Sequence, residues 1–542
     1  MRISLIVLAG TLLGASLVAA PQTTRLADTS AAGAATTATF YKDVLPVLQK
    51  NCQSCHRPGE VAPMSLLTYE QARPWARAIK SAIATKQMPP WFADPAVGSF
   101  ANDARLSDGE IATITRWVDA GAPMGEVKDM PKAPTFTQGW QLGEPDMIVE
   151  LPEVQIPATG ADYFPTPSLT LPLTEDRWIR AVEIRPSNRE VTHHSVIFSA
   201  DVAGAMSAMA GGTPVATGGL FNVLAVWAVG TPATVYPDGM GRWVRKGQML
   251  RTNLHYHPNG KPQVDRTRVG LYFGKGEMRK EVAAALAGNV TFSIPPNEPN
   301  FEMRAVYMVD EDINVVSFFP HMHLRGKDMK MTATYPDGRR ETLLNVPAYD
   351  FNWQLFYYPT HTVPLPRGTR VDLVAHYDNS AANKHNPDPT KAVTFGEGSS
   401  SEMMFGMFEF TSVAGVSPTP ATDRARMEAL VATLPSDSSF LIDLPLGKEP
   451  MPVVLHVPRT GEGALYTQTM GMILPQPVAK LEWQGDSFQF NTLLRTLGPG
   501  GGFYAVTGTV GAGGVVRGTL QRLGGRAQTP PPPIDYTGAH KR

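Results

Sequence analysis

The run Arg189-Glu-Val-Thr-His-His-Ser-Val-Ile-Phe198 joins two adjacent histidines to a stretch rich in β-branched and aromatic residues, which is typical of a strand. Eleven of the twelve histidines lie beyond residue 190, and six of them form three close pairs, one of adjacent residues and two of the form His-x-His. The other two β-prone runs are Thr252-Asn-Leu-His-Tyr-His-Pro258 and Phe318-Phe-Pro-His-Met-His-Leu324. Together the three runs predict a β-rich region that binds metal.

The spacing within each pair decides how its imidazoles can be used. A His-x-His pair on a strand projects both rings from one face and forms a two-nitrogen metal clamp. Adjacent histidines point to opposite faces, so His193 and His194 can share a metal only where the strand ends or bulges. Zinc is the common metal of histidine clusters, copper also favours imidazole, and a thioether ligand would select copper. The isolated histidines are expected to be ordinary core or surface residues: His361, His376, His385, His456 and His540.

Toward the N-terminus, the only two cysteines of the chain lie in Cys52-Gln-Ser-Cys55-His56. A C-x-x-C-H run is the attachment signature of c-type haem, in which both thiols bond the vinyl groups and the histidine binds iron. Apolar residues recur at helical spacing over 40–48, and Ser107-x-x-Glu110 is a capping box. These features predict one covalent haem c held between helices.

The sixth iron ligand is expected to be a thioether on a loop after the haem motif. Met88, in Lys86-Gln-Met-Pro-Pro-Trp91, is the best candidate because the two prolines stop a helix and hold an extended loop. Met64 and Met124 are the alternatives. Ligation by His and Met suits electron transfer. Residues 38–125 therefore resemble the cytochrome c domain.

The bulk properties and the N-terminus indicate an exported protein. The formal net charge is -1 without long runs of one sign, so nucleic acid and anionic membrane surfaces are not expected partners. Residues 1–20 combine Arg2, an apolar stretch and the small-residue end Val18-Ala-Ala20, which is typical of a signal peptide; a membrane anchor is the alternative. No later segment has about 18 uninterrupted apolar residues, so no further span is expected. The predicted location is the periplasm or the exterior.

The histidine runs, in their order along the chain, resemble the copper type II, ascorbate-dependent monooxygenases such as the peptidylglycine α-hydroxylating and dopamine β-monooxygenases. The resemblance covers roughly residues 140–415 and includes Ser400-Ser401-Glu402-Met403. It implies two β-sandwich domains, each holding one copper across an open cleft. One copper would be bound by His193, His194 and His255, and the other by His321, His323 and Met403. Met404 is an alternative to Met403, and His257 could replace or assist His255.

The resemblance also implies a division of labour between the two coppers. The His/His/Met copper would bind O2 and hydroxylate a C–H bond, and the three-histidine copper would pass an electron. Family members take electrons from ascorbate, whereas here the fused haem could deliver them from an external donor. The family's substrate-binding Arg is replaced by Phe319 and its Tyr by Met407. A glycine-extended peptide substrate is therefore not expected, and the pocket should be more apolar.

The expected fold is a multidomain chain with a small all-α cytochrome c domain, two jelly-roll-like β-sandwich copper domains and a β-rich C-terminal extension. The expected segments are a signal peptide (1–20), the cytochrome c domain (38–125), a linker (126–139), the two sandwiches (140–285 and 286–415), the extension (416–528) and a disordered tail (529–542).

The expected function is that of an exported haem- and copper-containing monooxygenase acting with O2 on a small organic substrate. The first alternative is a haem/copper electron-transfer protein that hydroxylates nothing. The second is an enzyme that uses zinc or one copper, with the haem as electron acceptor.

Overall fold

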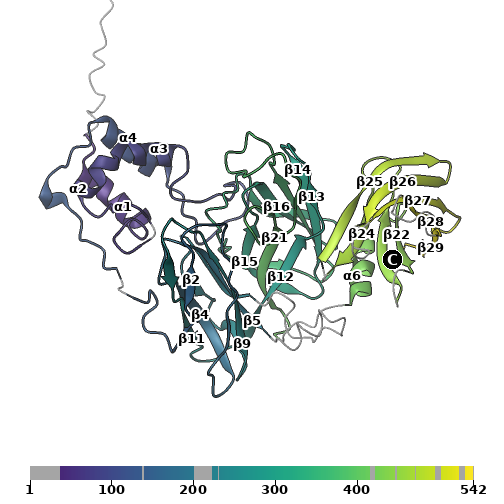
Figure 1. Ribbon diagram of the computed structural model, residues 1–542, viewed down its shortest axis with the longest axis horizontal. Helices are drawn as coiled ribbons and strands as arrows, with labels where there is room; N and C mark the ends of the chain where they lie inside the picture. Colours follow the sequence, from purple (N-terminus) through teal and green to yellow (C-terminus); the bar gives the residue numbers. More distant parts are fainter. Residues whose placement is uncertain are drawn as a thin grey trace, which may run out of the picture.

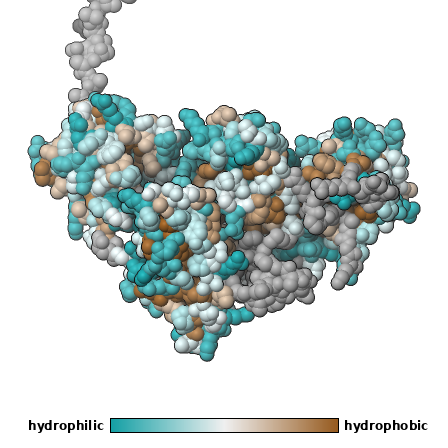
Figure 2. All heavy atoms as spheres, viewed as in Figure 1, coloured by the Kyte–Doolittle hydropathy of each residue, from teal (hydrophilic) through white to brown (hydrophobic). Residues whose placement is uncertain are grey.

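The computed structural model describes residues 37–60, 62–136, 139–200, 223–229, 231–415, 422–445, 449–469, 472–494, 502–523 and 532–540. The expected signal peptide lies outside these residues. Strands make up 43% of the chain and helices 12%, so the expectation of a mainly β protein is confirmed. Within the described ranges, no helix has both the length and the hydrophobicity needed to cross a membrane. Figure 2 shows hydrophilic residues over most of the viewed face, with hydrophobic residues in separate patches.

Most of the helices lie at one end of the molecule (Figure 1). They are the π-helix Phe40–Val44, α1 (Leu45–Asn51), α2 (Tyr69–Ala72), the 3-10 helix Arg73–Trp75, α3 (Ala76–Ala84) and α4 (Asp108–Asp119). Ser107 and Glu110 form the predicted capping box at the start of α4. Phe40, Leu48, Ile114 and Trp117 are fully buried in a core that belongs to this helical region.

Residues 91–104 leave the helical region and pack on a β core. The rings of Trp91 and Phe100 contact Tyr357 edge-on, with centroids 4.9 and 5.6 Å away. Asp94 donates its backbone N–H to Asn345 O at 2.8 Å. The expected domain 38–125 is therefore not one packing unit, because Trp91 and Phe100 bury their rings in the core of later β strands.

One sheet runs through both expected sandwiches. Its strand order is β1-β11-β4-β8-β12-β21-β15-β18, with β7 beside β4. The parallel pairing of β8 with β12 joins the two parts, and the expected border at 285/286 falls inside β12. The strands are β1 (Met147–Glu150), β4 (Arg177–Arg185), β7 (Thr234–Val235), β8 (Met240–Val244), β11 (Arg268–Phe273), β12 (Lys280–Asn289), β15 (Ile313–His321), β18 (Val363–Leu365) and β21 (Met404–Ser412).

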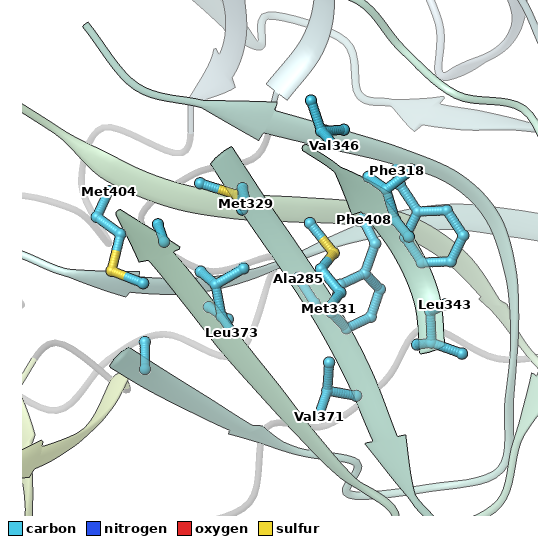
Figure 3. Close-up of a cluster of buried hydrophobic side chains, with 14 of the residues drawn as sticks. Ala285, Phe318, Met329, Met331, Leu343, Val346, Val371, Leu373, Met404 and Phe408 are labelled. Atoms are coloured by element: carbon cyan, nitrogen blue, oxygen red, sulfur yellow. The ribbon is translucent and has the colours of Figure 1, made fainter. Parts of the chain in front are cut away.

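A second layer covers each part of this sheet. In the first β unit, residues 139–279, the sheet β3-β9-β5-β6 shares a core with β1, β4 and β11. In the second β unit, residues 280–415, the strands β17-β16-β19-β14 share a core with β12, β15 and β21, part of which is drawn in Figure 3. The covering strands are β3 (Ser168–Thr170), β5 (Thr192–Ala200), β6 (Val223–Ala228), β9 (Met249–Tyr256), β14 (Phe301–Met308), β16 (Gly326–Thr334), β17 (Arg340–Val346) and β19 (Arg370–Tyr377). Two short ladders complete the units: β2 (Val154–Ile156) with β10 (Gln263–Asp265), and β13 (Ser293–Ile294) with β20 (Val393–Thr394).

A buried ion pair joins the two β units. Arg242, on β8, donates to the Glu409 carboxylate, on β21, at 2.7 Å, and both side chains are buried. Arg242 also donates to Val282 O at 2.6 Å, and Ser317 Oγ donates to Glu409 at 2.8 Å. Removing one partner of such a pair leaves an uncompensated buried charge. The pair therefore fixes how the units lie against each other.

The C-terminal strands form a closed eight-stranded sheet at the other end of the molecule (Figure 1). Each strand pairs with the next from β22 to β29, and β29 pairs back with β22. Helix α6 (Asp423–Ala432) packs beside it on the apolar cluster shared with β14. The strands are β22 (Ser439–Leu444), β23 (Met451–His456), β24 (Ala464–Thr469), β25 (Met472–Gln484), β26 (Ser487–Leu494), β27 (Gly502–Val510), β28 (Val515–Leu523) and β29 (Ile534–Ala539).

The predicted disordered tail is wrong over residues 534–539. These residues form β29, which pairs with both β22 and β28 and buries Tyr536. Without this strand, β22 and β28 would expose unpaired backbone groups along two edges. The four prolines before it obscured the strand in the sequence.

Candidate metal centre

The first histidine set forms where β5 meets β9. His194 lies opposite His255, and the register of the two strands shifts between Thr192 and His194. This shift is the irregularity that the sequence required for adjacent histidines to share a metal. The rings of His193 and His194 each lie 4.8 Å from that of His255, and one nitrogen of each of the three rings lies within 4.8 Å of the others.

The nitrogen positions in this set fit a metal ion. His193 Nδ1 and His194 Nδ1 are 3.3 Å apart. Two imidazole nitrogens about 2.0–2.1 Å from one tetrahedral metal are separated by about 3.3 Å. His193 Nε2 and His255 Nδ1 are buried without a hydrogen-bond partner. Unpaired buried polar atoms are costly, and metal ligation is one way to satisfy them.

The second set lies where β15 ends. The rings of His321 and His323 are 5.2 Å apart. His321 Nδ1 contacts the buried Gln354 Oε1 at 2.8 Å, and His323 Nδ1 contacts Ser401 O at 3.2 Å. When Nδ1 donates to an oxygen, Nε2 is the nitrogen available to a metal. Both rings are therefore oriented as metal ligands commonly are.

The strand register separates Met403 from Met404. His321 lies opposite Phe405, so these two side chains share a face of the sheet. Met404 points to the other face, where it is fully buried beside Met329 and Leu373 (Figure 3). Met403 comes directly before β21, and its carbonyl accepts a hydrogen bond from Tyr377 Oη at 2.8 Å. The geometry therefore favours Met403 over Met404 as the thioether ligand.

The two histidine sets lie together, in contrast to the expected open cleft. The rings of His194 and His321 are 6.4 Å apart. Phe351 bridges the sets, since it stacks on His193 at 4.6 Å and meets His323 at 5.7 Å. The continuous sheet and the Arg242–Glu409 pair hold the two units in this arrangement.

Burial keeps these imidazoles neutral. Desolvation lowers the pKa of His193 to about 3, that of His321 to about 4 and that of His323 to about 3. It also lowers the pKa of His194 well below its usual value, and the neighbouring histidines add to the effect. Neutral imidazole is the form that binds metal, so protons compete weakly for these sites.

Glu402 organises the second set. Its carboxylate accepts hydrogen bonds from the backbone N–H of His323 at 2.9 Å and of Arg325 at 2.7 Å. Burial raises the pKa of Glu402 to about 8 despite these bonds. The side chain thus fixes the turn after His321 and adjoins Met403 in the chain.

Asp162 supports the first set. Its carboxylate lies 2.9 Å from His255 Nε2 and 2.7 Å from His257 Nδ1, and it accepts a hydrogen bond from Ser399. Burial by itself would raise the pKa of Asp162, but the contacts with His255, Ser399 and His257 hold it well below its usual range. His257 is 76% exposed and lies outside the group of three. The geometry therefore favours His255 as the ligand and assigns His257 a contact with Asp162.

Apolar residues from both β units pack beside His321. The Phe319 ring stacks on His321 at 6.3 Å and on Phe356 at 4.5 Å. The cluster also contains Met407 from β21 and two valines from β6, Val223 and Val226. The two positions that depart from the family pattern, Phe319 and Met407, thus belong to one apolar cluster next to the candidate centre.

The haem motif forms a turn after α1. The backbone N–H groups of Cys55 and His56 both donate to Cys52 O, at 3.1 and 2.9 Å. His56 Nδ1 contacts Met64 O at 3.3 Å, which leaves Nε2 for iron. Burial raises the pKa of the Cys52 thiol to about 12. The turn brings both cysteines and His56 together, so these residues fit a covalently attached haem.

The three candidate sixth ligands lie in different places. Met64 contacts His56 Nδ1 through its carbonyl oxygen at 3.3 Å, and its side chain packs on the core of the helical region. Met124 is exposed at 39%. Met88 is half-buried in the turn after α3, where its N–H donates to Ala82 O at 3.2 Å. Met88 stays the predicted sixth ligand, with Met64 and Met124 as the alternatives.

Several site residues carry no recognisable signal in the sequence. Asp162, Phe351 and Gln354 are single residues in loops, and only the fold brings them to the histidines. Glu402 stands in the run that carries Met403, but its role depends on the backbone of the turn between β15 and β16. Contacts between residues so far apart in the sequence can be identified only from the tertiary structure.

Comparison with known proteins adds little to this geometry. No protein-family model matches the sequence, and no curated protein matches it. Among solved structures, the major capsid protein P2 of bacteriophage PM2 is similar, with 9% identity and a TM-score of 0.21 over 50% of this chain and 100% of the phage chain. A likeness at this TM-score carries no argument about fold or function.

Proposed function

We propose that this protein is an exported copper-dependent monooxygenase that hydroxylates a C–H bond of a small organic substrate with O2. The observation that carries the proposal is the convergence of five imidazoles from two β units, three of them buried and two half-buried, beside Met403 at the start of β21. Electrons would reach the centre through a haem c attached at Cys52, Cys55 and His56, from an ascorbate-like reductant or a redox protein.

Two coppers fit the donor sets. Copper bound by His321, His323 and Met403 would supply oxygen activation, and copper bound by His193, His194 and His255 would supply one-electron transfer. Soft thioether sulfur favours Cu(I), which distinguishes the second set from a zinc site. The protein's own part is to keep the imidazoles neutral, to hold the His-x-His turn through Glu402 and to orient His255 through Asp162.

The apolar cluster indicates the kind of substrate. Phe319, Phe356 and Met407 exclude water beside His321 and present no charge that would bind a carboxylate. An apolar C–H substrate gains free energy by entering such surroundings, whereas a charged one loses hydration. We therefore propose a small, mainly apolar organic substrate.

A second function is favoured by the closeness of the two sets. With His194 and His321 only 6.4 Å apart and most of the rings buried, the centre also suits electron storage without hydroxylation. The protein would then be a haem/copper electron-transfer protein of the periplasm.

Metal analysis followed by oxygen uptake tests these functions. We expect two coppers and one haem per chain, and reductant-dependent O2 consumption matched by hydroxylated product across a panel of small apolar compounds. Stoichiometric zinc would contradict both functions. Two coppers without substrate-dependent O2 consumption would favour the electron-transfer protein. His361→Gln is a matched control, because this isolated histidine is outside both sets.

A further inference from the structure

Three charged residues join the haem-attachment loop to the first β unit. Glu60 forms ion pairs with Arg57, at 3.0 Å, and with Arg189. The side chains of Arg57, Glu60 and Arg189 are only 13, 16 and 17% exposed. Ion pairs that are largely buried are screened by salt much less than surface pairs. This Arg57–Glu60–Arg189 triad is therefore a specific contact and not an incidental surface pair.

Both ends of the triad adjoin candidate redox sites. Glu60 comes four residues after His56, and Arg189 comes four residues before His193. The Arg189 segment is itself held to the centre, since Val191 O accepts a hydrogen bond from the His257 N–H at 2.8 Å. Thr192 Oγ1 donates to Asn188 O at 2.7 Å and closes the turn that contains Arg189.

Other ion pairs of the helical region differ from the triad. Lys50 pairs with Glu110 at 2.9 Å, and both belong to the helical region. Lys80, on α3, and Asp119, on α4, also form an ion pair within this region. The Glu60–Arg189 pair instead links residues 129 apart in the chain. Arg57 adds a second anchor, because its guanidinium lies over the Phe136 ring at 4.3 Å from the centroid.

We propose that the Arg57–Glu60–Arg189 triad docks the haem-attachment loop on the turn that leads into β5 and His193, and so fixes the route by which electrons enter the three-histidine site. This inference rests on the proposed function. The step it serves is a one-electron transfer in which iron is oxidised from Fe(II) to Fe(III) and copper is reduced from Cu(II) to Cu(I). A covalent tether alone would allow many separations between the two groups, whereas a docked tether holds one.

The test compares Arg189→Gln with Arg189→Lys in the full-length protein carrying its haem and metals. Hydrogen exchange of residues 53–60 should accelerate in Arg189→Gln, because the loop loses its partner. The rate of haem oxidation by Cu(II), followed by stopped-flow absorbance, should fall roughly tenfold or more. Arg189→Lys keeps the charge and should retain much of both properties. Lys50→Gln removes an ion pair of the same charge type within the helical region and should change neither.

Unchanged hydrogen exchange in Arg189→Gln would overturn the docking contact. Faster exchange with an unchanged oxidation rate would overturn its role in electron transfer. Failure of the proposed function has a different signature, namely wild-type protein that contains no copper. Copper content of the variants should equal that of the wild type, since Arg189 is not a ligand.

Discussion

The imidazole rings of His194, on β5, and His321, at the end of β15, lie 6.4 Å apart although they belong to different β units. The two histidine sets thus adjoin across a packed contact, and Phe351 lies against both. Because the two sets are so close, each could bind its metal alone or the two could form one shared centre.

We expect each metal to be lost separately. His194→Ala should remove one copper, because the nitrogens of His193, His194 and His255 form a group by themselves. Met403→Ala should weaken Cu(I) at the other site and abolish hydroxylation, while the His194 copper still exchanges electrons with the haem. Copper counts on the two variants decide the matter, with Met404→Leu as a control for the core. Loss of both coppers from each variant would show a shared centre instead.

Asp162→Asn should lower the affinity of the three-histidine site for copper by roughly 10–100-fold, because carboxylates beside ligating histidines orient the ring and raise its basicity. The contact at stake is the 2.9 Å approach of Asp162 to His255. Competition with a chelator measures the affinity. His257→Gln removes only the exposed partner of Asp162 and should have a smaller effect. Equal losses in the two variants would argue that His257 is a ligand.

The stability of the metal-free protein should fall as the pH drops from about 6.5 toward about 4. Desolvation lowers the folded pKa of His193 and His323 to about 3 and of His321 to about 4, below the ordinary value of 6.5. Between these values the unfolded chain binds more protons, so unfolding is favoured as pH falls. Glu402 acts in the opposite direction, since burial raises its pKa to about 8, but it contributes one proton against several.

Thermal unfolding across this pH range measures the effect. His323→Gln should flatten the slope, because it removes one of the titrating groups. A melting temperature that rises as the pH falls through this window would refute the burial of the neutral histidines.

Met88→Ala should remove the low-spin His/Met spectrum of the haem and leave the copper content unchanged. Met88 lies in the turn after α3, whereas the Met64 carbonyl contacts His56 Nδ1 at 3.3 Å. Met64→Leu is the matched control and should keep the spectrum. Loss of this spectrum in Met64→Leu but not in Met88→Ala would identify Met64 as the sixth ligand.

The buried Arg242–Glu409 pair should be a major determinant of stability. Arg242→Met leaves the Glu409 carboxylate buried without its partner and should cost about 3–5 kcal/mol. The double variant Arg242→Met with Glu409→Leu removes both charges and should recover most of that loss. Denaturant unfolding of the two proteins measures the difference. An Arg242→Met protein as stable as the wild type would show that the pair does not hold the units together.

The sequence by itself determined the local chemistry of this protein. Ser107 and Glu110 specified a capped helix and the histidine runs specified strands, because each signal depends on spacing within a few residues. The spacing of Cys52-x-x-Cys55-His56 predicts haem attachment in the same way. The need for a bulge at His193 followed from strand alternation alone and was met by the register shift in β5.

Only the tertiary structure decided what these elements meet. The placement of Trp91 in a distant core, the β8–β12 pairing and the strand β29 after a proline run depend on burial and on edge pairing between remote segments. The same holds for Asp162, Phe351 and Gln354, which are ordinary loop residues until the sheet brings the histidines to them. The 6.4 Å approach of His194 to His321 has the same origin, since packing energy between two β units is not encoded in the spacing of either run.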